Sequence, residues 1–207
     1  MVQIMNEKDI VKQGYNLAAE KYLEMRHEDL PEMHLLREFS LKFPEGSKIL
    51  DAGCGAGLPF TKFLSEKFDV IGVDISEKQI ELAKKNVPKA QFICEDMIKL
   101  SFPNDTFDGI ISYYAIIHIP REEHEILIRN FYKMLKPKGI ALLCFHQNDD
   151  PGSYYNDFFG VDMFWSGFDW KTNLKILENN GFKILWYKIV DDSLSEDSGH
   201  LFVAIQK

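Results

Sequence analysis

Short apolar segments that alternate with helical segments constrain the fold of this chain more than any other feature of its sequence. The apolar segments lie at 48–52, 70–74, 91–94, 107–112 and 140–145. Each is short enough for a buried strand and is bounded by turn-forming or polar residues. Helical signals lie between them at 57–68, 76–86 and 121–135. This alternation predicts an α/β protein with a parallel sheet and helices on both faces.

The two ends of the chain depart from this alternation. Residues 1–43 are predicted to form two helices, which end at Pro44 and Gly46. Residues 147–169 are rich in glycine, aspartate and aromatic residues and are interpreted as an inserted segment. A helix at 170–180, a strand at 182–190, a polar turn at 193–199 and a strand at 200–206 complete the prediction. Because a short turn joins the last two strands, the final strand is expected to run antiparallel to the others.

The composition indicates a globular protein and limits the classes of molecule that it is expected to bind. The 207 residues carry a formal net charge of −8, which opposes binding to nucleic acid and to anionic membranes. The three cysteines are far apart and lack metal-ligand spacing, so we expect buried free thiols and no metal site. No signal peptide is recognisable, and no apolar run approaches the ~20 residues of a membrane span. We therefore expect a cytoplasmic protein with one domain, either a monomer or a homodimer.

A glycine-rich loop follows the first predicted strand, in the sequence ILDAGCGAG. Ligands of α/β proteins bind at the carboxyl ends of the strands, where Gly53, Gly55 and Gly57 let the backbone approach a ligand closely. The spacing G-x-G-x-G differs from the G-x-G-x-x-G of dinucleotide sites, and Asp51 would repel a pyrophosphate. The loop therefore favours a ligand with a positive centre. A tight turn that binds nothing is the alternative.

Two further acids follow the next two strands. Asp74 is placed to accept hydrogen bonds from ribose hydroxyls, as the acidic residue of dinucleotide folds does. Asp96 is placed to meet the amino group of an adenine, with Met97 packed on the ring. Either aspartate alone is equally compatible with a solvated strand end or a helix cap. Acids after three successive strands are harder to explain in that way.

This combination resembles the class I S-adenosylmethionine-dependent methyltransferases, in the motifs ILDAGCGAG, VIGVDIS, CEDM, FDGIISYYAIIHI and LKPKGIALL. The small-molecule branch of that family is the most similar. The resemblance implies a doubly wound, Rossmann-like sheet of seven strands, mostly parallel with the last strand antiparallel. It also implies a single methyltransferase domain. Its parts are a helical lid at 1–45, a cofactor-binding core at 46–146, an aromatic insert over the substrate pocket at 147–169 and a helix with a strand hairpin at 170–207.

The resemblance assigns the three loop glycines to the methionine part of S-adenosyl-L-methionine, Asp74 to the ribose and Asp96 with Met97 to the adenine. Tyr15 and Tyr22 match the lid that closes over the cofactor. The complete predicted cofactor site is Tyr15, Tyr22, Asp51, Gly53, Cys54, Gly55, Gly57, Asp74, Ile75, Asp96, Met97 and Tyr113.

Histidines and aromatic residues are the candidates for the chemistry and for the acceptor site. His118 and His146 follow strands, and His200 begins the last one, so each is a candidate base near neutral pH. A structural or solvated role is the alternative for each of them. His124, on a predicted helix, is expected at the surface. The predicted substrate pocket consists of Tyr114, Phe164, Trp165 and His200.

The insert and the residue that follows it contain eight aromatic residues between 154 and 170, a density typical of a ring-stacking substrate wall. A small subsidiary core or a dimer contact is the alternative. Methyl transfer to a small, partly apolar or aromatic acceptor is the leading hypothesis. A regulatory module that binds S-adenosylmethionine without catalysis is the second. A nicotinamide-dependent oxidoreductase is the third, and Asp51 and the glycine spacing argue against it.

Overall fold

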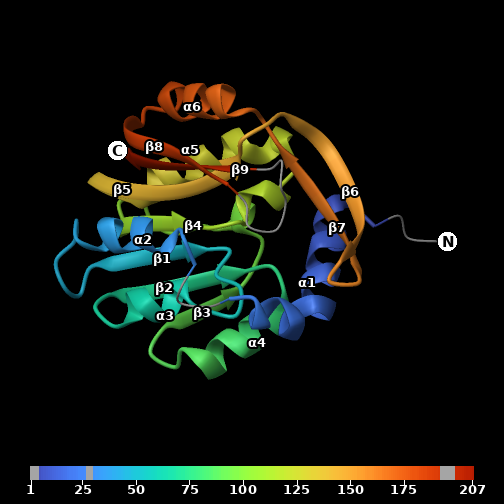
Figure 1. Ribbon diagram of the computed structural model, residues 1–207. Coiled ribbons are helices and arrows are strands. Elements are labelled where there is room, and N and C mark those ends of the chain that lie inside the picture. Colours follow the sequence, from blue (N-terminus) through green and yellow to red (C-terminus); the bar gives the residue numbers. More distant parts are fainter. Residues whose placement is uncertain (1–4, 27–29, 192–198) are drawn as a thin grey trace.

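A seven-stranded sheet forms the centre of the computed structural model, which describes residues 5–26, 30–191 and 199–207 (Figure 1). In spatial order its strands are β3 (Gln91–Cys94), β2 (Asp69–Asp74), β1 (Lys48–Ala52), β4 (Phe107–Ser112), β5 (Leu135–His146), β9 (Gly199–Gln206) and β8 (Lys183–Asp191). The five strands from β3 to β5 pair in parallel. Strand β9 is antiparallel to both of its neighbours, as predicted.

An apolar core covers each face of the sheet. Adjacent residues of the central strands point to opposite faces, so that Leu50 belongs to one core and Ile49 to the other. Helices α5 (His124–Met134) and α6 (Trp170–Asn179) close the first core. Helices α2 (Met33–Ser40) and α3 (Phe60–Ser65) close the second. Burial on both faces explains why the central strands are continuous apolar runs.

Two elements stand at the carboxyl ends of the parallel strands and enclose the space above them. Helix α1 (Glu7–Glu24) begins at a capping box between Asn6 and Asp9 and packs against α4 (Glu77–Asn86). Strands β6 (Asp150–Phe158) and β7 (Val161–Gly167) form a separate two-stranded ribbon beside α1 (Figure 1). The aromatic insert is therefore a β-hairpin rather than an irregular segment. Phe159 and Gly160 form its turn, both with positive φ.

Several predicted boundaries and environments differ from the structure. Helix α3 starts three residues later than predicted, because the glycine loop continues as a turn through Pro59. Strand β5 starts at Leu135, five residues early, through a register shift in its pairing with β4. Cys94 is exposed because β3 is the edge of the sheet. The predicted turn at 193–199 lies almost entirely outside the described residues.

His124 is buried, contrary to the prediction of a surface position. Its Nε2 lies 3.1 Å from the Ile119 carbonyl oxygen, and burial lowers its pKa to about 4. Within the described ranges, no helix has the length and apolar character needed to cross a membrane.

Candidate functional site

A cavity of about 650 Å³ lies between α1 and the carboxyl ends of β1 to β4. Nine of the twelve predicted cofactor residues line it: Tyr15, Tyr22, Gly53, Gly55, Asp74, Ile75, Asp96, Met97 and Tyr113. They come from α1, from the glycine loop and from the segments that follow β2, β3 and β4. The strand order thus brings together residues that are as much as 98 positions apart in the sequence, from 15 to 113.

The glycine loop lies flat against the sheet because its backbone adopts conformations that side chains disfavour. Gly53 has φ 85° and Gly55 has φ 52°. A Cβ atom on Gly53 would stand 2.1 Å from the Cβ of Ala115. The amides of Gly53 and Cys54 both donate to the Val73 carbonyl oxygen, at 2.7 and 2.9 Å. The bare backbone of Gly53 and Gly55 therefore lines the cavity.

Asp74 is held rigidly beside this loop. Its two carboxylate oxygens accept hydrogen bonds from the amides of Gly55 and Ser76, each at 2.9 Å. Burial raises the pKa of the carboxyl to about 6, although these hydrogen bonds act in the opposite direction. Each oxygen keeps a further lone pair, so the group can still accept hydroxyl donors from the cavity.

Asp96 caps the turn after β3 and binds a residue that the sequence analysis missed. It accepts hydrogen bonds from the Ile98 amide at 3.0 Å and from the Lys8 ammonium at 2.8 Å. Lys8 also forms an ion pair with Glu123. Lys8, Val11, Tyr15 and Tyr22 all line the cavity from one face of α1, at spacings of three, four and seven residues. That helical spacing is the signal that would have identified Lys8.

Three predicted cofactor residues do not line this cavity. Asp51 is 1% exposed and accepts a hydrogen bond from Thr61 Oγ1 at 2.5 Å, so it lies beneath the loop rather than facing a ligand. Burial raises its pKa to about 7. Gly57 packs against α4, where an added Cβ would stand 3.0 Å from a Val87 methyl group. Cys54 lines a smaller adjoining cavity of about 310 Å³ together with Arg26.

A second cavity, of about 1810 Å³, lies between α1, the β6–β7 hairpin and the ends of β5 and β9. It is lined by both predicted catalytic histidines, His118 and His146, and by Tyr114, Trp165 and His200. Phe164 is the exception among the predicted substrate residues. It is 4% exposed and packs with Val11 and Met163, because neighbouring residues of a strand point to opposite faces.

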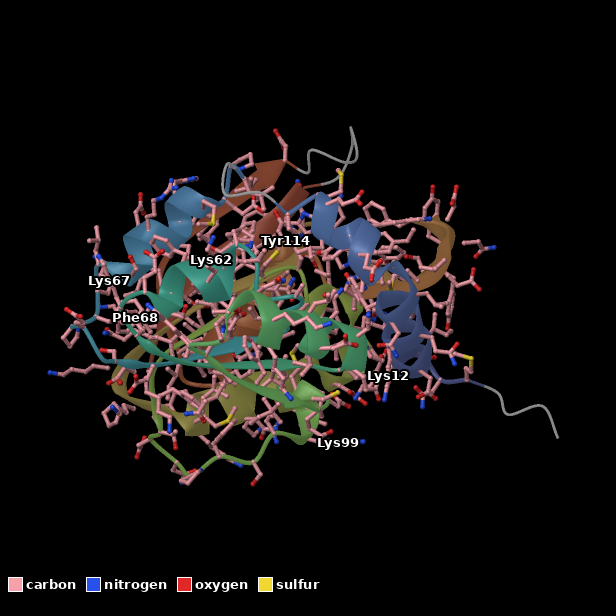
Figure 2. The ribbon with its side chains drawn as sticks, turned by 90° about the horizontal axis from the view of Figure 1, so that it is seen from below. Lys12, Lys62, Lys67, Phe68, Lys99 and Tyr114 are labelled. Carbon is pink, nitrogen blue, oxygen red and sulfur yellow. The ribbon has the colours of Figure 1, made fainter. Side chains whose placement is uncertain are left out.

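Four side chains line both cavities and form the boundary between them: Tyr15, Tyr22, Tyr114 and His118. Figure 2 shows Tyr114 near the centre of the molecule, whereas Lys12, on α1, lies toward the outside. Tyr114 has φ 54°, an uncommon value for a residue with a side chain. A group bound in one cavity can reach a group bound in the other only at this boundary.

The tautomer of neutral His118 is fixed by its two hydrogen bonds. Its Nδ1 lies 2.7 Å from the Phe164 carbonyl oxygen, which can only accept, so Nδ1 carries the proton. Its Nε2 lies 2.9 Å from the Tyr15 hydroxyl and therefore accepts from it. Burial lowers the pKa of His118 to about 4, so the ring is neutral near pH 7.

His146 has the same charge but a different hydrogen-bonding state. Burial lowers its pKa, and a hydrogen bond with the Ile117 backbone acts in the opposite direction. Its Nε2 is buried and has no hydrogen-bond partner among the described residues. The Ile117 carbonyl therefore faces Nδ1, and the lone pair of the buried Nε2 is left without a donor within the described part of the chain. Of the two histidines, His146 is the one whose Nε2 has a free lone pair.

No group of three or more histidine, cysteine, aspartate or glutamate side chains in the described ranges is arranged to hold a metal ion.

Comparison with known proteins identifies the fold and the central segment. The family model described as a methyltransferase domain matches residues 49–139. Phosphoethanolamine N-methyltransferase 3 of Arabidopsis thaliana is 37% identical over 109 residues, which are 50% of this chain. The match covers only 22% of that relative, so this chain spans about a fifth of its length.

Two solved structures match over the whole chain. The magnesium protoporphyrin IX methyltransferase of Synechocystis PCC 6803, with bound S-adenosylmethionine, has a TM-score of 0.75 and 17% identity, and the match covers 100% of both chains. The 1,6-didemethyltoxoflavin-N1-methyltransferase of Burkholderia thailandensis, with its substrate and S-adenosylhomocysteine, has a TM-score of 0.75 and 17% identity, covering 100% of this chain and 92% of that one. At this identity the two matches establish the fold. The matched methyltransferase segment, the sheet order and the glycine loop together support a class I S-adenosylmethionine-dependent methyltransferase fold.

Proposed function

We propose that this chain transfers the methyl group of S-adenosyl-L-methionine to a small acceptor molecule. The observation that carries the proposal is the pair of cavities. One is lined by nine predicted cofactor residues, and it shares a boundary of four side chains with a larger one that seven aromatic residues help to line. The related protein from Arabidopsis thaliana is named for N-methylation of phosphoethanolamine. The matching structure from Burkholderia thailandensis was crystallised with a methyl acceptor and S-adenosylhomocysteine.

The residues of the smaller cavity fit the parts of this cofactor. The backbone of Gly53 and Gly55 leaves room for the methionine part, and nothing closer than 3.7 Å faces a Cβ position on Gly55. The Asp74 carboxylate, held by two amides, has lone pairs left for ribose hydroxyls. Asp96 and Met97 line the end of the cavity that is assigned to the adenine. Lys8 donates a hydrogen bond to Asp96 at the same end.

The cofactor, when bound, supplies a methyl group that its sulfonium centre has already activated. The protein then has to bring the acceptor atom in line with that group and to exclude water. Tyr15, Tyr22 and Tyr114 form the apolar boundary at which the two molecules meet. His146 Nε2 has the lone pair that can accept a proton from the acceptor. The Tyr15–His118 hydrogen bond keeps the boundary in one arrangement.

Calorimetric titration with S-adenosylmethionine and S-adenosylhomocysteine tests the cofactor assignment. Asp74→Ala is expected to weaken binding about tenfold or more, because two ribose hydrogen bonds are lost. Asp69→Ala, at the exposed start of the same strand, is the matched control and should bind like the unaltered protein. No binding by the unaltered protein at millimolar ligand would contradict the proposal.

Transfer of a labelled methyl group to a panel of amines, phenols, thiols and carboxylates tests catalysis. Turnover on any acceptor supports an enzyme. Cofactor binding without turnover across the whole panel would favour the regulatory module instead. A fluorescence change with NADH, in the absence of S-adenosylhomocysteine binding, would favour the oxidoreductase.

A further inference from the structure

The larger cavity is acidic in the part of the chain that the structure describes. Glu32, Asp157 and Asp191 line it, and Arg26 is the one lysine or arginine among its described lining residues. Glu32 is only 3% exposed and is hydrogen-bonded with the Tyr114 hydroxyl. Asp157 and Asp191 are exposed to solvent at the cavity, where their carboxylates attract cations and repel anions. The lining therefore selects against an acceptor that carries a carboxylate or a phosphate.

The aromatic walls of the same cavity already hold a cation. The Arg26 guanidinium lies over the Tyr22 ring at 4.5 Å and over the Tyr114 ring at 4.9 Å from their centroids. Phe158 and Trp165 extend this wall from the hairpin, with 5.5 Å between their ring centroids. Aromatic faces bind ammonium groups as they bind a guanidinium. The wall thus suits an acceptor with a cationic head and a flat or apolar body.

The unpartnered nitrogen of His146 adds a third feature. A lone pair in a buried position without a donor costs stability unless a ligand supplies the hydrogen bond. An N–H group of a bound amine is a donor of the required kind. A carboxylate would bring only acceptors, and an ether or a thioether likewise.

Resting on the proposed methyl transfer, we propose that the acceptor is a small amine with an aromatic or apolar body and that it is methylated on nitrogen. The amine binds as the ammonium between the acids and the aromatic wall. One N–H proton passes to His146 Nε2 and from there to solvent. The freed lone pair of nitrogen forms the bond to the methyl carbon, while the carbon–sulfur bond breaks and its electron pair stays on sulfur. The methylated ammonium and neutral S-adenosylhomocysteine are the products.

The test compares three ligands that share one ring and differ in charge. Phenethylamine, 2-phenylethanol and phenylacetate are titrated into protein saturated with S-adenosylhomocysteine. The amine is expected to bind about tenfold more tightly than the alcohol, and the acid more weakly than both. Equal binding of amine and alcohol, or tighter binding of the acid, would overturn the inference.

Two variants on the hairpin make the test specific. Asp157→Asn removes a carboxylate that lines the cavity and should reduce the preference for amine over alcohol about threefold or more. Asp162→Asn removes one from the same hairpin that does not line it, and the preference should not change. Equal preference in both variants would also overturn the inference. Failure to bind S-adenosylhomocysteine would refute the proposed function, whereas normal binding of that product without selection for the amine refutes only this inference.

Discussion

His118 and His146 differ in the one property that a general base requires. Both rings are neutral near pH 7 because burial lowers their pKa. His118 Nε2 already accepts a hydrogen bond from the Tyr15 hydroxyl, whereas the buried His146 Nε2 has no partner in the ranges that the structure describes. A proton acceptor needs a free lone pair within reach of the acceptor molecule. The structure therefore separates two histidines that occupy equivalent positions in the sequence, each shortly after a strand.

We expect His146→Ala to lower kcat about 100-fold on an acceptor identified by the labelled-methyl panel, with unchanged affinity for S-adenosylhomocysteine. His118→Ala should also weaken cofactor binding, because it releases Tyr15 from the boundary between the cavities. The acid limb of the pH–rate profile should lie below 6.5, the ordinary pKa of histidine, since burial lowers the pKa of His146. His34→Ala, at an exposed position, is the control. Unchanged turnover in His146→Ala would contradict the assignment.

At the residue scale, the sequence predicted which side chains gather at the site better than it predicted where they point. The glycine spacing identified the loop that lines the cavity, because only glycine tolerates the positive φ and the close approach to Ala115. Asp51 lies beneath the glycine loop, where it accepts a hydrogen bond from Thr61. Phe164 packs with Val11, whereas its neighbour Trp165 lines the larger cavity, because one position of difference on a strand turns a side chain to the opposite face.

At the scale of elements, Gly14 sets how closely α1 approaches the hairpin. A Cβ atom at this position would stand 2.8 Å from the Asp162 carbonyl oxygen and 2.8 Å from Met163 Cε. The methionine end can move, but the carbonyl belongs to the backbone of β7. This contact positions α1 above the cofactor cavity and the hairpin above the larger one. It could not be predicted from the sequence, since a glycine within a helix carries no signal of its partner.

Gly14→Ala is expected to destabilise the protein by about 1 kcal/mol, because overpacking against β7 outweighs the gain in helix propensity. Urea unfolding measures the effect. The control is Gln13→Ala on the exposed side of the same turn, which changes helix propensity without touching the hairpin. A stability gain in Gly14→Ala as large as the one in Gln13→Ala would show that α1 and β7 do not press against each other.

The parallel part of the sheet was predictable element by element, whereas the hairpin was not. Strands β1, β2 and β4 each contain consecutive aliphatic residues or aliphatic residues around a glycine, β3 is the short segment QFIC, and the carboxyl ends of all four define the site. The insert carries aromatic residues on both faces, so its alternation of apolar and polar positions is lost. Trp165 faces the larger cavity and Phe164 faces Val11. A strand between two apolar environments cannot be distinguished from an irregular aromatic loop by its periodicity.

At the scale of the whole molecule, folding shifts the pKa values of four buried groups in opposite directions, upward for two aspartates and downward for two histidines. Asp51 and Asp74 have folded-state pKa values of about 7 and about 6, above the ordinary value of 3.8. Between pH 3.8 and 7 the unfolded chain loses these protons first, so both acids lower stability as the pH rises. His118 and His124 have folded-state pKa values of about 4, below the ordinary 6.5. Below pH 6.5 the unfolded chain gains these protons first, so both histidines lower stability as the pH falls.

The contributions of the two aspartates and of the two histidines to stability nearly cancel between pH 5 and 7. The variant Asp51→Asn removes one of the four contributions and should make the remaining pH dependence measurable. The amide oxygen of asparagine can still accept a hydrogen bond from the Thr61 hydroxyl, but residue 51 then has no carboxyl group to titrate. From pH 5 to pH 7, the free energy of unfolding of Asp51→Asn should therefore rise by about 2 kcal/mol more than that of the unaltered protein. Asp69→Asn removes an exposed carboxylate next to the same sheet and should keep the profile of the unaltered protein. Urea denaturation at pH 5, 6 and 7 measures all three proteins. Parallel profiles for Asp51→Asn and the unaltered protein would mean that Asp51 titrates alike in the folded and unfolded chains, in spite of its burial.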